Sequence, residues 1–135
     1  MTTSAVSQSP ALLVGASVFG TIFLGFGINA MLRPRAALAF FELGAPASAA
    51  EQTLVDALMT VYGARDVFMG LAMYATAYAG DRAALGCLLV AGSGVALVDG
   101  FVCWRYAGKG EWSHWGYAPM LTAVGSVLLG VLDGK

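Results

Sequence analysis

Residues 10–32 form an apolar run without a single charged side chain. As a helix rising about 1.5 Å per residue, this run is long enough to cross a hydrocarbon core about 30 Å thick. Arg33-Pro34-Arg35 follows it with two cations and a helix-ending proline, as expected at a membrane interface. The run is too long for the core of a signal peptide, so we predict a retained transmembrane helix.

Charged residues are scarce along the rest of the chain as well. They make up 11% of the 135 residues, whereas 59% are hydrophobic. A soluble domain carries roughly 25% charged residues. We therefore predict an all-α fold, an integral membrane four-helix bundle with a short interfacial helix after the first span. The predicted spans are 10–32, 52–79, 82–106 and 115–132, in a single domain 10–135 that follows a polar tail 1–9.

Local signals predict where the second and third spans begin and end. Ser48 and Glu51 have the spacing of a capping box, which starts a helix. Gly80-Asp81 is typical of a tight turn, in which glycine closes one helix and aspartate caps the next. The second and third spans are therefore expected to form an antiparallel hairpin.

Small residues recur at helical spacing on the first two spans. Close approach through small side chains is a main source of helix association in lipid. The faces predicted to pack in this way, within the chain or in a homo-oligomer, contain Ala16, Gly20 and Gly27 on the first span and Gly63, Gly70 and Ala77 on the second.

Composition also excludes several classes of partner and cofactor. The net charge is −1, and no cluster of Lys and Arg could neutralise several phosphates, so nucleic acid is not an expected partner. Cys87 and Cys103 lie on one predicted helix about 24 Å apart, too far for a disulfide. No His or Cys pair has metal-ligand spacing, so we expect neither a metal centre nor a cofactor.

The distribution of basic residues predicts the orientation of this multi-pass protein. Loops rich in Lys and Arg remain in the cytosol. The first and third loops hold Arg33, Arg35, Arg105 and Lys109, whereas the opposite side holds Arg82 and Lys135. Both termini are therefore predicted to be non-cytosolic.

Charged side chains within the predicted spans are the strongest pointers to function. Asp56, Arg65 and Asp66 lie on the second span, and Asp99 lies on the third. Such a charge at mid-bilayer costs about 2.5–3.5 kcal/mol even on a lenient scale, so these side chains should point inward toward partners. Counting residues from the Gly80-Asp81 turn places Asp99 within one helical turn of Arg65. We predict an Arg65–Asp99 ion pair, with Arg65–Asp66 as the competing pair.

The aspartates outnumber the arginine at this depth. Asp56 is near a helix start and can reach interfacial water, which leaves Asp66 and Asp99 sharing Arg65. Either one carboxyl is protonated or water enters the site. A neutral carboxylic acid is the form that a general acid needs, so Asp66, Asp99 and Arg65 are the candidate catalytic residues.

Further polar residues are predicted to line the same pocket. The candidate ligand-binding residues are Asn29, Asp56, Tyr62 and His114. Asn29, His114, Glu42 and Tyr117 are expected to rim an opening on the side of the first and third loops.

Three sequence blocks carry a resemblance to a known family: Asn29-Ala-Met-Leu-Arg-Pro34, Tyr62-Gly-Ala-Arg-Asp66-Val-Phe-Met-Gly70 and Asp99-Gly100. The chain resembles an uncharacterised family of small fungal and bacterial membrane proteins, described as a domain of unknown function. It is also similar to DoxX-like four-helix membrane proteins. The resemblance covers nearly the whole chain and implies a four-span bundle in a membrane. It implies no activity and no catalytic residues.

Three functions remain open on the sequence alone. The first is binding of a membrane lipid or another lipophilic small molecule, with acid–base isomerisation or cyclisation as a further step. The second is a structural or assembly protein in which Arg65 bridges both aspartates in a dry core without a cavity. The third is a small proton-coupled transporter, which Arg65 disfavours because such carriers need an accessible carboxylate that exchanges protons.

Overall fold

The computed structural model describes residues 5–134, so residues 1–4 of the predicted tail and Lys135 lie outside it. The described residues confirm the all-α prediction and contain no strand. The longer helices are α1 (Pro10–Leu32), α3 (Ala49–Ala79), α4 (Arg82–Val102) and α6 (Ala118–Leu128). The short elements are the helices α2 (Pro34–Leu38) and α5 (Trp112–Trp115), the 3-10 turns η1 (Val6–Gln8) and η2 (Ala39–Phe41), and the π-helical turn η3 (Cys103–Ala107).

The predicted helix signals at Ser48, Gly80 and Asp81 are confirmed, whereas α3 begins at Ala49 rather than residue 52 and α4 gives way to the π-helical turn η3 after Val102. The Ser48 hydroxyl accepts a hydrogen bond from the Glu51 backbone N–H at 3.2 Å. Glu51 itself accepts from the Ala47 N–H at 2.7 Å, one residue earlier than a standard capping box would place it. At the other end of α3, Gly80 adopts a left-handed φ of 74°, which a residue without a Cβ tolerates. Asp81 then caps α4 by accepting from the Ala84 N–H at 2.9 Å.

The predicted continuous helix over 115–132 is wrong. The segment holds the end of α5, a short break at Gly116 and Tyr117, and then α6, which stops at Leu128. Pro119 lacks a backbone N–H and so begins a helix rather than continuing one. Gly130, with a left-handed φ of 84°, sits in the turn after α6. The 11 residues of α6 extend only about 16 Å.

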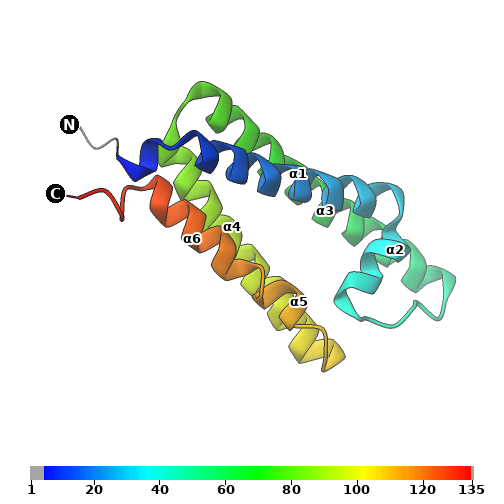
Figure 1. Cartoon of the computed structure of the whole chain (residues 1–135). Coiled ribbons are helices and arrows are strands. Elements are labelled where there is room, and N and C mark those ends of the chain that lie inside the picture. The colour runs from blue at the N-terminus through cyan, green and yellow to red at the C-terminus, as the bar shows by residue number, and fades with distance from the viewer. Residues whose placement is uncertain (1–4, 135) are drawn as a thin grey trace.

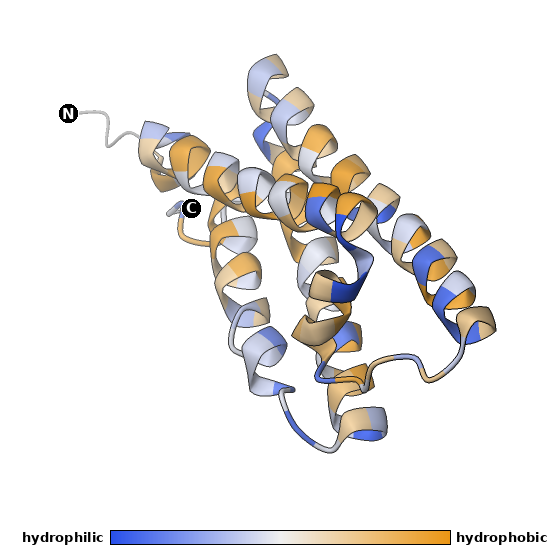
Figure 2. Ribbon diagram, turned by 90° about the vertical axis from the view of Figure 1, so that its right-hand side faces the viewer, coloured by the Kyte–Doolittle hydropathy of each residue, from blue (hydrophilic) through white to orange (hydrophobic). Residues whose placement is uncertain are grey.

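Two helices among the described residues are long and apolar enough to cross a membrane: Pro10–Leu32, and Arg82–Ala107, in which α4 continues into η3. α3 is longer than either of them but carries Asp56, Arg65 and Asp66. Large apolar side chains are exposed on the outer surfaces of these helices, and Figure 2 shows hydrophobic residues along every long helix.

The helices pack in two pairs. α1 lies along α3, and α4 lies along α6, as Figure 1 shows. The two pairs meet near the ends of the chain and diverge toward α2 and α5.

Glycines let α1 and α3 approach backbone to backbone. A Cβ on Gly27 would lie 2.6 Å from the Gly63 carbonyl oxygen, and one on Gly70 would lie 2.6 Å from the Gly20 carbonyl oxygen. No real side chain tolerates such contacts, so glycine is required at these crossings. The small-residue faces predicted from the sequence therefore pack on each other within the chain, and an oligomer would have to use other surfaces.

Hydrogen bonds fasten the two ends of the described chain to the start of α4. Arg82 donates through Nη1 to the carbonyl oxygens of Ser7 at 2.9 Å and Ser9 at 3.0 Å. Asp133 accepts from the Ser7 backbone N–H at 2.9 Å. Hydrogen bonds from the side chain and the backbone N–H of Ser7 favour the ionised carboxylate and so lower the pKa of Asp133 from its ordinary value. We call Ser7, Ser9, Arg82 and Asp133 the terminal clip.

Replacing Gly27 tests the close contact between α1 and α3. Gly27→Ala should lower the free energy of unfolding by about 1–3 kcal/mol, because the added methyl meets backbone atoms that cannot turn away. Gly25→Ala is the matched control, since a Cβ there has nothing within 4 Å. The measurement is thermal unfolding of both variants in the same detergent. Equal melting temperatures for the two would contradict the predicted contact.

The terminal clip should weaken in acid. Because the pKa of Asp133 is lower in the folded chain, its stabilisation is present above the unfolded pKa and is lost as the pH falls through the folded one. Asp133→Ala should therefore melt below wild type at pH 7, and the gap should close under strongly acidic conditions. Val131→Ala, at an exposed neighbour, is the control. A gap that stays constant with pH would refute a carboxylate-dependent clip.

Candidate functional site

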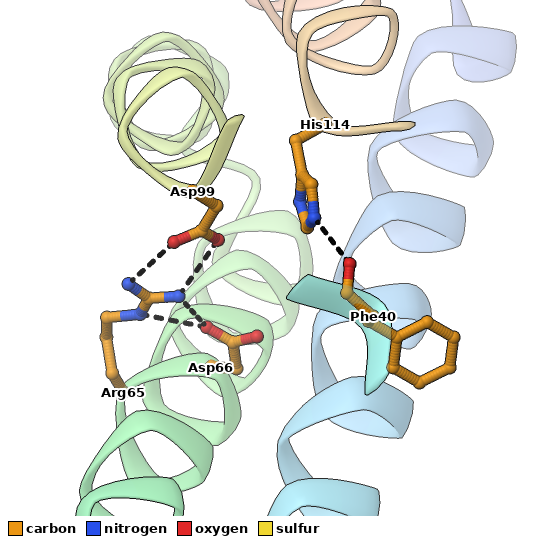
Figure 3. A network of polar contacts seen from close by, with 5 residues as sticks. All are labelled: Phe40, Arg65, Asp66, Asp99 and His114. Carbon is orange, nitrogen blue, oxygen red and sulfur yellow. Dashed lines mark hydrogen bonds and ion pairs between the residues drawn. The ribbon is translucent and has the colours of Figure 1, made fainter. Parts of the chain in front are cut away.

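Arg65 forms ion pairs with both aspartates, as Figure 3 shows. Its Nε and Nη2 each lie 3.0 Å from Asp66 Oδ1. Nη1 and Nη2 donate to the two oxygens of Asp99, at 3.4 Å and 3.2 Å. The predicted Arg65–Asp99 pair and its competitor Arg65–Asp66 thus occur together.

Helical periodicity places these three side chains at one level between α3 and α4. Asp66 belongs to the buried face of α3, in step with Gly63, Gly70 and Met73. Its side chain is 3% exposed, whereas Arg65, one residue around the helix, keeps 35% of its side chain exposed. Asp99 faces them from the buried side of α4, where its side chain is 12% exposed.

Aromatic side chains extend the site from Arg65 toward the short helices. The Arg65 guanidinium carbon lies 4.5 Å from the centre of the Tyr62 ring, in a cation–π contact. Phe41 meets the Tyr62 ring edge to face at 5.3 Å and stacks on the His114 ring at 5.3 Å. His114 Nε2 lies 3.2 Å from the Phe40 carbonyl oxygen, which can only accept, so this nitrogen is the donor.

His114 is positioned by its neighbour on α5. Trp115 donates through Nε1 to the Leu97 carbonyl oxygen of α4 at 3.1 Å. Its indole covers Gly100, where any Cβ would collide with the ring. Trp115 therefore holds α5 against α4, and His114 is left free to reach η2.

A cavity of about 510 Å³ lies between the two helix pairs beside the ion pairs. Its wall is mostly apolar and aromatic, with a few polar groups. It is lined by Ile22, Phe23 and Phe26 of α1, Ala39, Phe40 and Glu42 at η2, Tyr62 and Asp66 of α3, Ala96 and Asp99 of α4, and Ser113, His114 and Tyr117 at α5 and just after it.

Tyr117 lines this cavity and carries a hydroxyl without a hydrogen-bond partner in the described part of the chain. Its hydroxyl oxygen is buried and has no hydrogen-bond partner among residues 5–134. The ring is held edge to face against Phe19 at 5.5 Å and Phe23 at 6.2 Å. Buried hydroxyls normally have a hydrogen-bond partner, so this hydroxyl is a candidate to form a hydrogen bond with a ligand.

Comparison with known proteins assigns the chain to a family. A family described as "Domain of unknown function (DUF4267)" matches residues 20–128. The chain belongs to the DUF4267 family. The match includes every residue that lines the cavity. No curated protein and no solved structure matches the chain.

The site of this DUF4267 protein contains most, but not all, of the predicted residues. Tyr62, Arg65, Asp66, Asp99 and His114 come together around the cavity and its ion pairs, and Glu42 and Tyr117 line it as predicted for the rim. Asn29 and Asp56, which were also predicted for the pocket, do not line this cavity. Asp56 instead accepts from Gln52 Nε2 on its own helix at 2.6 Å.

The apolar wall of the cavity was missed from the sequence. Phe23, Phe26, Phe40 and Ala96 look like ordinary core or lipid-facing residues in an apolar chain. Only the crossing of the helix pairs shows which of these side chains face the cavity. Within the described residues, no group of three or more His, Cys, Asp or Glu side chains could hold a metal ion.

Removing the Arg65 guanidinium should destabilise the fold, because the two aspartates would lose their cation. Arg65→Gln should lower the free energy of unfolding by roughly 3 kcal/mol, because it leaves two buried carboxylates without a cation. Arg105→Gln, at an exposed arginine, should change it little. The triple variant Arg65→Gln, Asp66→Asn, Asp99→Asn should recover most of the loss. Thermal unfolding measures all three, and a triple variant no more stable than Arg65→Gln would refute this account.

Proposed function

We propose that this chain is an integral membrane four-helix bundle whose buried polar pocket binds a lipophilic small molecule. The observation that carries the proposal is the cavity of about 510 Å³, with an apolar aromatic wall and polar groups gathered at the ion pairs. Small-molecule pockets are typically about 300–1,000 Å³, mostly apolar, with a few convergent polar groups.

Several features support the membrane location. Two helices are long and apolar enough to cross a bilayer, and large apolar side chains face outward. Burial of Asp66 and Asp99 against Arg65 would let α3 cross as well, because its charges are paired inside the protein. The terminal clip joins the two ends of the chain, which fits an even number of crossings. In this arrangement α5 and α6 supply the fourth crossing and both termini are non-cytosolic.

The chemistry of the wall supports a lipophilic ligand. Phe23, Phe26 and Phe40 offer aromatic surface, and Ile22 adds aliphatic surface. An apolar ligand that moves from water into the cavity is transferred to an apolar environment, which is favourable. A ligand that enters from the bilayer remains in an apolar environment. Asp66, Asp99 and the Tyr117 hydroxyl would then fix its polar end.

Acid–base isomerisation or cyclisation of the bound molecule is the enzymatic form of this proposal. It is supported by the surplus of carboxylates, since Asp66 and Asp99 share a single guanidinium. If one of the two held a proton, it could give that proton to a double bond or ring oxygen in the cavity. The other aspartate would stabilise the positive charge that develops and would then take a proton from a neighbouring carbon, which completes the isomerisation or cyclisation.

A structural role is the second candidate, and the bridging arginine favours it. Arg65 contacts both aspartates. This arrangement is expected of a protein whose buried charges only specify how its helices pack. That hypothesis also predicts a dry core without a cavity, whereas the pocket lies directly beside Asp66 and Asp99. The cavity is therefore the feature that makes ligand binding the better-supported function.

Filling the cavity should weaken binding of a lipophilic probe. Ala96→Leu adds bulk to the wall, so it should weaken binding of 1-dodecanol at least tenfold. Ala91→Leu is the matched control, because Ala91 is exposed on the same helix and does not line the cavity. The measurement is the rise in melting temperature that saturating 1-dodecanol causes in each purified variant.

Comparing shifts within each variant removes the effect of the substitution on stability. If Ala96→Leu does not fold, Ala39→Leu fills the cavity from its edge on η2. Equal shifts in wild type, Ala91→Leu and the cavity-filled variant would show that dodecanol acts elsewhere and would refute the proposal. The absence of any shift in wild type would count against it as well.

A further inference from the structure

The cavity wall carries an unbalanced negative charge. Its acidic residues are Glu42, Asp66 and Asp99, and no Lys or Arg in the described range 5–134 lines it. Glu42 is paired with Lys109 at 3.1 Å near the surface. Among residues 5–134, Asp66 and Asp99 have only Arg65 within ion-pair distance. Two carboxylates against one guanidinium leave a formal charge of −1 on these three side chains.

The geometry of Arg65 shows on which atom this charge is left. Asp99 uses both of its oxygens on the guanidinium. Asp66 receives both of its contacts from Arg65 on Oδ1. Its second oxygen points away from the guanidinium, toward the side on which His114 and Phe40 lie (Figure 3). Within the described residues, the second oxygen of Asp66 therefore has no cation beside it, although its carboxylate is nearly buried and lines the cavity.

The rest of the wall is suited to the same kind of partner. The rings of Phe23, Phe26, Phe40, Tyr62 and Tyr117 line the cavity, and aromatic faces attract cations. The Tyr117 hydroxyl is buried and unpaired, so its oxygen can accept a hydrogen bond from a ligand. The cavity thus combines a buried negative charge, aromatic residues and a hydrogen-bond acceptor. Together these groups favour a ligand that is positively charged and donates hydrogen bonds.

We propose that the ligand of this pocket is a lipophilic amine. Its ammonium group binds the second oxygen of Asp66, which Arg65 does not contact, and the Tyr117 hydroxyl, and its hydrocarbon body lies between the aromatic residues. The inference rests on the proposed function, that the cavity binds a lipophilic molecule, and adds the chemical class of that molecule. One ammonium neutralises the site, which removes the cost of an unpaired buried charge.

Other ligand chemistries fit the wall less well. A fatty acid would bring a second negative charge against Asp66 and Asp99, and like charges at short range repel strongly where the dielectric constant is low. An alcohol could donate one hydrogen bond to Asp66, but it would leave the surplus charge in place. The order of affinity should therefore be amine, then alcohol, then carboxylate.

Three probes of equal chain length test this order: dodecylamine, 1-dodecanol and dodecanoate. The full chain is placed in phosphatidylcholine nanodiscs, which carry no net charge, and binding is measured by calorimetry. Wild type should bind dodecylamine at least tenfold more tightly than 1-dodecanol, with dodecanoate weakest. Asp66→Asn should remove the preference for the amine and leave 1-dodecanol binding within a few-fold of wild type.

Asp56→Asn is the matched control, because it makes the same chemical change on the same helix outside the cavity. It should leave the amine preference intact. Tyr117→Phe gives a second reading if Asp66→Asn does not fold, since it removes a hydroxyl without a partner and keeps the ring. It should weaken dodecylamine binding several-fold and change 1-dodecanol binding less.

The outcomes separate the two proposals. If 1-dodecanol binds at the cavity as tightly as the amine, or if the amine preference survives Asp66→Asn, the amine assignment fails and the pocket remains a lipophilic site. The same holds if Tyr117→Phe leaves dodecylamine binding unchanged. If none of the probes binds wild type, the proposed function itself fails. Loss of the preference in Asp66→Asn but not in Asp56→Asn supports the amine.

Discussion

The structure depends on one guanidinium between two carboxylates. Arg65 and Asp66 belong to the α1–α3 pair, and Asp99 belongs to the α4–α6 pair, so this contact joins the two halves of the fold. Within the described residues it is the ion pair that links the long helices. Asp66 and Asp99 are buried and Arg65 is partly exposed, so salt screens these pairs less than it screens pairs on the surface. The same burial makes a carboxylate without its own cation unfavourable. The contact that joins the two halves therefore also favours binding of a positively charged partner.

Much of the fold follows from local signals in the chain. α1 has the predicted bounds because Arg33-Pro34 ends an uninterrupted apolar run, and α3 and α4 are bounded by Ser48, Gly80 and Asp81. The level of Arg65 and Asp99 could be predicted because a tight turn fixes the register of a helical hairpin. α6 could not, since the apolar pattern continues past Leu128 while Pro119 and the turn at Gly130 limit the helix.

The cavity could not be predicted for a different reason. Phe23, Phe40 and Ala96 are far apart in the chain, and each has the composition of an ordinary core or lipid-facing position. Which of them meet depends on how closely α1 approaches α3 through Gly27 and Gly63, and on how far α4 diverges from them. The sequence placed Asn29 and Asp56 in the pocket by their depth along the helices. Depth alone does not determine which face of a helix lines a space between four elements.

The terminal clip has a mechanical consequence for the cavity. It ties the first and last turns of the chain to the beginning of α4, at the end where the two helix pairs meet. The two pairs diverge from that end toward α2 and α5. There they are joined again, because His114 Nε2 donates to the Phe40 carbonyl oxygen and Lys109 pairs with Glu42. The pairs that enclose the cavity are thus fastened to each other on both sides of it.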